Sequence, residues 1–129
     1  CECEKRILLL VYRKDKLKCR LENPEINNLL KSYGYGNCKS CKDYITHLKK
    51  RLKNKDFPHE IGAFLGYPIN DIYGFINGKN NKCLMVGEWK VYDDVEGAKL
   101  LFERYKACRN GIQKRINQGK TLAQIFCAA

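Results

Sequence analysis

Residues 57–94 read FPHEIGAFLGYPINDIYGFINGKNNKCLMVGEWKVYDD, and this stretch decides the predicted fold. A proline at position 58 is typical of the first turn of a helix, which we expect to run over residues 58–65. The Gly-Tyr-Pro break at 66–68 ends that helix, and a second short helix is expected over residues 70–76. The stretch therefore predicts two short helices joined by a tight turn.

The second half of this stretch predicts a strand that leads into a long helix. After a turn at 78–81, residues 82–92 (KCLMVGEWKVY) indicate one strand, interrupted by a bulge at Gly87. Asp93 is expected to cap the final helix, with Glu96 completing a capping box. Gly119 ends this helix, and Thr121 starts a terminal turn. The apolar stripe of the helix is expected to contain Val95, Ala98, Leu101, Phe102, Tyr105, Cys108, Ile112 and Ile116.

The N-terminal part predicts a β-hairpin followed by two helices. Residues 6–13 (RILLLVYR) are nearly all apolar, and residues 16–22 (KLKCRLE) alternate with Leu17, Cys19 and Leu21 on one face. Helices are expected from a capping Asn-Pro pair at 23–24 to a glycine at 34, and over 41–53. The predicted order is ββααααβα. It corresponds to an α+β single domain over residues 1–129, with about five helices and a small antiparallel sheet made of the N-terminal hairpin and the late strand.

Composition limits the classes of partner. The chain has 129 residues, of which 30% are charged, and a net charge of +11. Such a charge favours a polyanion partner through counterion release, although it also serves solubility. No apolar run has the length of a membrane span, and the N-terminus lacks the pattern of an export signal. We therefore expect a cytoplasmic protein without a membrane partner, whose eight cysteines are reduced.

The pair of short helices at 58–77 has the spacing of a helix-turn-helix. Its inward positions are expected to be Ile61, Leu65, Ile72 and Phe75. The exposed face of its second helix is expected to contain Asp71, Tyr73, Gly74 and Asn77. That face offers no basic side chain for DNA. A structural corner and a nucleic-acid-binding module are the two hypotheses for this segment.

A run of lysines near position 50 gives a second candidate surface for a polyanion. Residues 49–55 read KKRLKNK, at the end of the helix predicted over 41–53. The candidate patch contains Lys42, Lys49, Lys50, Arg51, Lys53 and Lys55. A solvated helix face explains the same residues, and both interpretations stay open.

Cysteine spacing suggests a metal site. Cys38 and Cys41 are separated by two residues, as in metal-binding and redox motifs, and Cys41 is expected at a helix N-terminus, which lowers a thiol pKa. A structural metal ion needs two further ligands, for which Cys83 and Cys108 are the candidates. The alternative is that these thiols are small apolar side chains of the core.

His59 and Glu60 form a candidate acid–base pair. A metallohydrolase would need a second histidine four residues after His59, where the chain has Ala63. The alternative role of Glu60 is to stabilise the start of the helix, since an acid in the first turn suits the helix dipole. Together with Lys90, the pair defines the hypothesis of an enzyme pocket.

Several motifs resemble those of a bacterial family known as the domain of unknown function 3793 family, which is common in clostridia and related anaerobes. They are FPHEIGAFLGYP at 57–68, Asp71-Ile72, Gly74-Phe75-Ile76 and GEWKVYDD at 87–94, followed by Ala98, Phe102, Tyr105 and Cys108. The similarity covers about residues 6–126, and family members carry an additional N-terminal segment. The residues that match the shared motif, and so form the candidate pocket, are His59, Glu60, Tyr67, Asp71, Trp89, Lys90 and Tyr92.

The resemblance implies the cytosol of an anaerobe and an association with iron and flavodoxin-type redox metabolism; the family has no established activity. The first functional hypothesis is therefore a non-hydrolytic binding or accessory protein linked to iron, haem or redox metabolism. Its expected cofactor is a metal ion or haem, and its expected partner a redox protein. The alternatives are the nucleic-acid-binding module and the enzyme with a pocket around residues 59, 60 and 90.

Overall fold

The computed structural model describes residues 8–78 and 82–127. The chain divides into two compact units, an N-terminal unit of residues Cys1–Gly78 and a C-terminal unit of residues Lys79–Ala129. A single domain over residues 1–129 stays a prediction.

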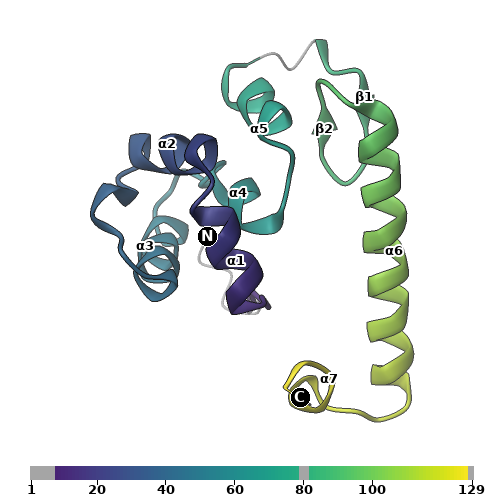
Figure 1. Cartoon of the computed structure of the whole chain (residues 1–129). Helices are drawn as coiled ribbons and strands as arrows, with labels where there is room; N and C mark the ends of the chain where they lie inside the picture. Colours follow the sequence, from purple (N-terminus) through teal and green to yellow (C-terminus); the bar gives the residue numbers. More distant parts are fainter. Residues whose placement is uncertain (1–7, 79–81, 128–129) are drawn as a thin grey trace. The chain divides into compact units, whose positions relative to one another are not determined.

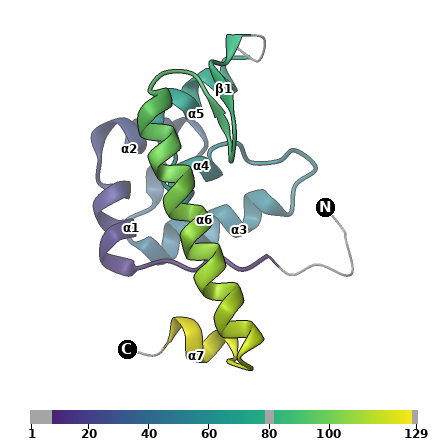
Figure 2. The same ribbon diagram turned by 90° about the vertical axis from the view of Figure 1, so that its right-hand side faces the viewer.

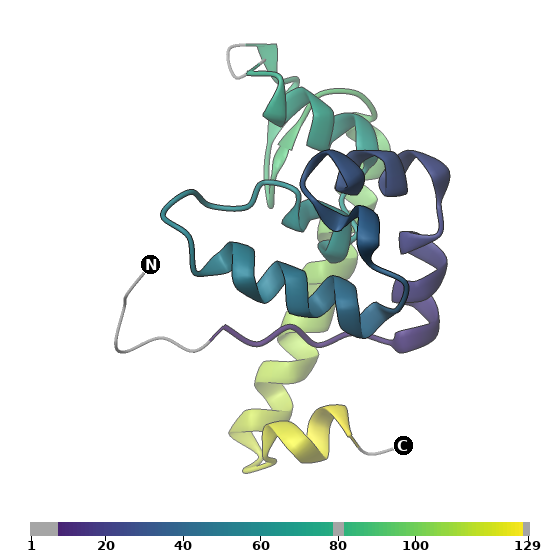
Figure 3. The ribbon, with the colours of Figure 1, turned by 90° about the vertical axis from the view of Figure 1, so that its left-hand side faces the viewer.

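The described part of the N-terminal unit is helical (Figures 1 and 3). Its elements are α1 (Lys14–Leu21), α2 (Pro24–Ser32), the 3-10 turn η1 (Tyr35–Asn37), α3 (Cys41–Leu52), α4 (Ile61–Leu65) and α5 (Ile69–Ile76). Helix α1 contacts α2, α3 and α4, so it is the centre of the unit. The buried core consists of Leu17, Leu21, Ile26, Leu29, Leu30, Tyr35, Tyr44, Leu48, Ala63, Phe64 and Ile72.

Local capping groups set the ends of these helices. The Asn23 side chain accepts hydrogen bonds from the first turn of α2. Ser40 and Asp43 form a reciprocal capping box at the start of α3. Gly34 and Gly66 follow α2 and α4 with φ of 87° and 85°, a left-handed conformation that favours glycine. The helices predicted at 24–34, 41–53 and 70–76 are thus confirmed with small shifts of their ends.

The prediction of an N-terminal hairpin is wrong. Residues 14–21 form helix α1, and residues 8–13 pair with no strand of the described chain; Arg6 and Ile7 lie outside the described residues. Leu17 and Leu21 are both buried whereas Cys19 is exposed. Because residues four apart share one face of a helix, these two leucines fit α1 as well as they fit an alternating strand.

The C-terminal unit contains a short hairpin and a long helix (Figures 1 and 2). Its elements are β1 (Met85–Val86), β2 (Lys90–Val91), α6 (Val95–Asn117) and α7 (Leu122–Phe126). The two strands are antiparallel, and Met85 pairs with Val91. The single strand predicted over 82–92 is therefore wrong, since the chain reverses at Gly87–Trp89 instead of bulging there. The predicted class, α+β with a small antiparallel sheet, is confirmed for the described residues.

Trp89 anchors the hairpin on α6. Its ring is 4.5 Å from that of Phe102, edge to face, and 6.0 Å from that of Tyr105. Gly87 is needed for this approach, because a Cβ atom at that position would lie 2.2 Å from the Phe102 ring. Helix α6 is capped by Asp94, whose Oδ1 accepts from the Gly97 N–H at 2.8 Å, and not by Asp93 as predicted. Among the described residues, no helix has both the length and the apolar character that a membrane span requires.

Candidate functional site

Glu60 lies at the centre of a buried polar cluster in the N-terminal unit. Its side chain is fully buried, and Oε1 accepts from Arg51 Nε at 2.8 Å while Oε2 accepts from Arg51 Nη2 at 3.3 Å. The Tyr35 hydroxyl donates to Oε1 at 3.3 Å. This two-point pairing of guanidinium and carboxylate compensates the charge that folding removes from water.

Tyr33, Tyr35 and His47 lie around the Arg51–Glu60 pair. The Arg51 guanidinium lies 5.4 Å from the centre of the Tyr33 ring, and His47 Nε2 is hydrogen-bonded to the Tyr33 carbonyl. The Tyr35 ring packs 4.2 Å from the His47 ring. Burial, and then the charge and hydrogen bond of Glu60, raise the pKa of Tyr35 well above its usual value. Tyr35 therefore stays a hydrogen-bond donor throughout the neutral range.

His59 and Glu60 do not face a common space, although they are adjacent in sequence. Glu60 points into the core, whereas His59 is exposed, with its ring centre 5.0 Å from that of Phe75 and 6.0 Å from that of Phe57. A general acid or base must reach its substrate. The buried position of Glu60 gives no support to catalysis by this pair, and the enzyme pocket with Lys90 stays a prediction.

The corner at 58–77 packs differently from the predicted helix-turn-helix. Leu65 and Phe75 are 38% and 37% exposed, so their inward assignment is wrong. Asp71 and Gly74, which were assigned to the exposed face, are buried. Since α4 has only five residues, its buried face falls on three successive positions, Gly62, Ala63 and Phe64.

Sequence reasoning missed Arg20, which holds this corner on α1. Its Nε donates to the Ala63 carbonyl at 2.6 Å, and its Nη2 donates to the Tyr67 carbonyl. These two carbonyls flank the end of α4, where backbone acceptors are left without helical partners. The signal available in the sequence was only an arginine in a leucine-containing run, so its partners were not predictable.

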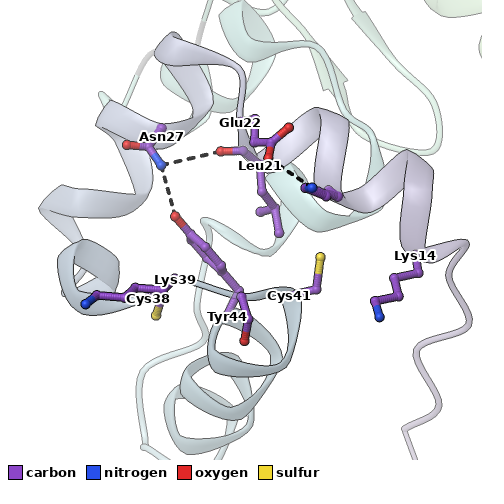
Figure 4. Close-up of a pocket in the computed structure, with 10 residues that line it drawn as sticks. Lys14, Leu21, Glu22, Asn27, Cys38, Lys39, Cys41 and Tyr44 are labelled. Carbon is purple, nitrogen blue, oxygen red and sulfur yellow. Dashed lines mark hydrogen bonds and ion pairs between the residues drawn. The ribbon is translucent and has the colours of Figure 1, made fainter.

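A pocket of about 330 Å³ opens between α1, α2 and the start of α3 (Figure 4). We call it the thiol pocket, because the sulfur-bearing residues Cys38 and Cys41 both line it. The remaining lining residues are Lys14, Lys18, Leu21, Glu22, Asn27, Lys39, Ser40 and Tyr44. Figure 4 shows Cys38 and Cys41 on either side of the Tyr44 side chain, with their sulfur atoms pointing away from each other.

Some polar groups of the thiol pocket bind one another. Asn27 Nδ2 donates to the Tyr44 hydroxyl at 2.9 Å, and Lys18 lies 3.8 Å from the Glu22 carboxylate. Burial, followed by the charge of Asp43, raises the pKa of the Cys38 thiol. A redox-active CxxC pair needs a thiol with a lowered pKa, so the raised pKa of Cys38 gives no support to this thiol as the attacking group of such a pair.

The four predicted metal ligands belong to two different units. Cys38 and Cys41 lie in the N-terminal unit, whereas Cys83 and Cys108 lie in the C-terminal unit. Within residues 8–78 and 82–127, no group of three or more His, Cys, Asp or Glu side chains is placed to hold a metal ion. A site made of all four cysteines stays a prediction.

A known family model covers nearly the whole chain. The model of the family described as protein of unknown function (DUF3793) matches residues 1–126. The chain belongs to this family. No curated protein and no solved structure matches it significantly.

In this member of the DUF3793 family, the motif residues have structural roles in both units. Within the N-terminal unit, Glu60 and Asp71 are buried, and the Tyr67 carbonyl binds Arg20. Within the C-terminal unit, Trp89 is buried between the hairpin and α6, beside Lys90 on β2 and Tyr92. The shared pocket of these residues stays a prediction.

The lysine patch of this DUF3793 member is exposed on and after α3. Within the described chain, five of its side chains make no ion pair: Lys42, Lys49, Lys50, Lys53 and Lys55. Arg51 differs from them, since its guanidinium is bound to Glu60. The charge available to a polyanion therefore comes from the lysines.

Proposed function

We propose that this chain is a non-hydrolytic binding or accessory protein and that the thiol pocket is its ligand site. The observation that carries the proposal is the lining of this pocket by two free thiols, Cys38 and Cys41, together with the Tyr44 hydroxyl and three lysines. Thiols are soft ligands that suit iron and other redox-active metals, and lysines attract anions. This combination supports a small anionic iron complex or redox-active anion as the ligand.

The size of the pocket favours a small ligand over haem. Its volume is at the lower end of the range for small-molecule sites. Its described lining includes no histidine, because His47 is bound to the Tyr33 carbonyl and His59 lies against Phe75. A haem would therefore need a site outside the thiol pocket.

The free thiols also support a cytosolic location. Six cysteines are unpaired in the part of the chain that the structure describes. Thiols persist in reducing compartments, whereas exported proteins convert them to disulfides. A reducing cytosol is accordingly the compartment in which the thiol pocket would keep its two sulfur ligands.

Iron binding by the full chain tests this proposal. We expect protein purified anaerobically to bind added ferrous iron with a change in its absorbance spectrum, and Cys38→Ser/Cys41→Ser to lose that binding. The matched control is Cys19→Ser/Cys127→Ser, which removes two exposed thiols outside the pocket. Equal iron binding by the two double variants would contradict the thiol pocket as the site, and a colourless, metal-free wild type would contradict the link to iron.

The anionic character of the ligand has its own test. The measured quantity is the alkylation rate of Cys41 by iodoacetate, an anion, divided by its rate with neutral iodoacetamide. We expect this ratio to be higher in the wild type than in Lys14→Gln/Lys39→Gln. The control is Lys16→Gln/Lys31→Gln, which removes the same charge outside the lining. Peptide mapping by mass spectrometry measures both rates, and an unchanged ratio in the pocket variant would show that these lysines attract no anion.

A second function, nucleic-acid binding, is favoured by the five lysines of the α3 patch that make no ion pair. The corner at 58–77 contributes less, because Asp71 and Gly74 are buried and its exposed face offers few polar groups. Lysines that contact phosphates make binding strongly salt-dependent. Titration of labelled RNA at several salt concentrations tests this function, and a salt slope near zero would exclude it.

A further inference from the structure

The second half of α6 and the segment that follows it carry only positive charge. After Glu103 the sequence contains no aspartate or glutamate, but it contains six basic residues: Arg104, Lys106, Arg109, Lys114, Arg115 and Lys120. A solvated helix more often mixes both signs, since opposite charges three or four residues apart stabilise it. This segment was not among the candidate surfaces found in the sequence.

Most of this charge is uncompensated in the structure. Arg109 binds Glu88 with two hydrogen bonds of 2.6 Å. The other five basic side chains are exposed and, within the described residues, make no ion pair. Lys114 and Arg115 lie in the last turn of α6, where cations suit the helix dipole, but Lys106 lies more than two turns earlier. The dipole therefore explains only part of the pattern.

Three amide side chains share one side of the helix with two of these cations. Lys106, Asn110, Gln113, Lys114 and Asn117 lie within about 100° of the helix circumference, so they share one face. Gln113 Nε2 donates to Asn117 Oδ1 at 2.9 Å, which confirms that these two amides are neighbours. We call these five exposed residues the α6 basic face; it extends for roughly 16 Å along the helix, and Arg115 lies on the opposite side.

We propose that the α6 basic face binds the phosphate backbone of a nucleic acid. Lysine and arginine contact phosphate oxygens, while amides both donate and accept hydrogen bonds, as the sugar-phosphate backbone and base edges require. A membrane-surface helix would need large apolar side chains along its length, but the second half of α6 has only Ile112 and Ile116 as aliphatic residues. The chemistry of the face therefore favours nucleic acid over an anionic lipid surface.

Salt-dependent binding of the full chain tests this proposal. The probes are fluorescein-labelled single-stranded RNA and duplex DNA of about 20 nucleotides per strand, long enough for several phosphate contacts, with anisotropy measured between about 50 and 200 mM KCl. We expect Lys106→Gln/Lys114→Gln to reduce the slope of log K against log salt by about 2, since each lost contact contributes nearly one unit. Far-UV circular dichroism verifies that the variant is folded.

The matched control is Lys49→Gln/Lys50→Gln, which removes the same charge from α3. We expect this control to lose less of the salt slope than the α6 variant. A loss of slope in the α3 variant with none in the α6 variant would overturn the proposal and assign binding to the α3 patch. A wild-type slope near zero, or binding to phosphatidylserine vesicles without binding to either nucleic acid, would also overturn it.

The amides allow a second, independent measurement. We expect Asn110→Ala/Asn117→Ala to weaken binding several-fold at every salt concentration while leaving the slope unchanged, because amides make hydrogen bonds without releasing counterions. If this variant bound as tightly as the wild type, the face would act through its charge alone, and the contribution proposed for the amides would be wrong.

Discussion

Two arginine–glutamate pairs of this chain have the same chemistry in different surroundings. In the N-terminal unit, Arg51 holds Glu60, whose side chain is fully buried, while Arg51 itself is 28% exposed. In the C-terminal unit, Arg109 holds Glu88 across the surface, with side chains 59% and 32% exposed. Both arginines bind both oxygens of their partner. The difference between the pairs is therefore burial, not geometry.

Burial changes what each pair does for the protein. Removal of one partner from a buried pair leaves an uncompensated charge in a poorly solvated site, whereas water replaces a lost partner at the surface. The Tyr35 hydroxyl also donates a hydrogen bond to Glu60, so the first pair positions a third side chain. We infer that the Arg51–Glu60 pair determines how the N-terminal unit is packed, and that the Arg109–Glu88 pair only links the hairpin to α6.

The largest expected effect is that of Glu60→Gln. The change leaves Arg51 without its charged partner beside a buried amide, and we expect it to lower the free energy of unfolding by about 3 kcal/mol. Urea denaturation followed by far-UV circular dichroism measures this loss. If the surface control Glu88→Gln lost a similar amount of unfolding free energy, burial would not explain a difference between the two pairs.

A companion variant tests whether apolar side chains can replace the buried cluster without loss of stability. Tyr35→Phe/Arg51→Met/Glu60→Leu replaces the whole cluster with apolar side chains, and we expect its stability to lie within about 1 kcal/mol of the wild type, because such replacements are often neutral. If the triple variant were as unstable as Glu60→Gln, the cluster would be needed for packing that apolar side chains cannot reproduce.

A smaller effect is expected at Gly87 in the C-terminal unit. A methyl group there would lie 2.2 Å from the Phe102 ring, and the ring must move away from Trp89 to accommodate it. We expect Gly87→Ala to cost about 1 to 3 kcal/mol. The control Gly111→Ala adds a methyl group in open space within α6 and should stabilise by about 0.5 to 1 kcal/mol. Fluorescence of Trp89, the single tryptophan, reports both transitions.

Next in size is the effect of Tyr35→Phe, which we expect to cost about 1 kcal/mol at neutral pH through the lost hydrogen bond to Glu60. The folded pKa of Tyr35 is raised above that of the unfolded chain, so its contribution is complete below about pH 10 and is lost as the pH rises further. The wild type should therefore lose more stability than Tyr35→Phe between neutral and strongly alkaline pH. Equal losses in urea denaturation curves would contradict this assignment.

The smallest effect belongs to Glu88→Gln. Hydrogen bonds from Arg109 lower the pKa of the Glu88 carboxyl, so the contribution of this pair is present above the usual carboxyl pKa and is lost as the pH falls through the lowered value. We expect Glu88→Gln to be hard to distinguish from the wild type at neutral pH and high salt, since salt screens exposed charges. A large, salt-independent loss in thermal denaturation would show that the exposed pair is structural.

Local signals in the sequence predicted most of the helices. Asn23-Pro24 and Thr121 act within one helical turn, so their effect does not depend on the rest of the fold. The N-terminal strand failed because Leu17 and Leu21 satisfy both periods, and only the packing of α1 against α2, α3 and α4 resolved the ambiguity.

The candidate site was less predictable than the fold. The sequence showed that His59 and Glu60 are adjacent, but not that one is exposed and the other buried. The pairing of Arg51 with Glu60 joins α3 to the segment before α4, and that of Arg20 with the Ala63 carbonyl spans 43 positions. Contacts of this kind follow from tertiary packing, which leaves no periodic signal in the chain.

By itself, the sequence determined the family, most of the helices and the excess of positive charge, because motifs, caps and charge are local or additive properties. Only the tertiary structure decided which charges are compensated and which groups share a pocket. It buried Glu60 with Arg51, brought Lys14, Asn27 and Tyr44 into the lining of one pocket, and left five basic residues after Glu103 without ion pairs among the described residues. The physical reason is that solvation and pairing depend on distance in space, and folding sets that distance for residues far apart in the chain.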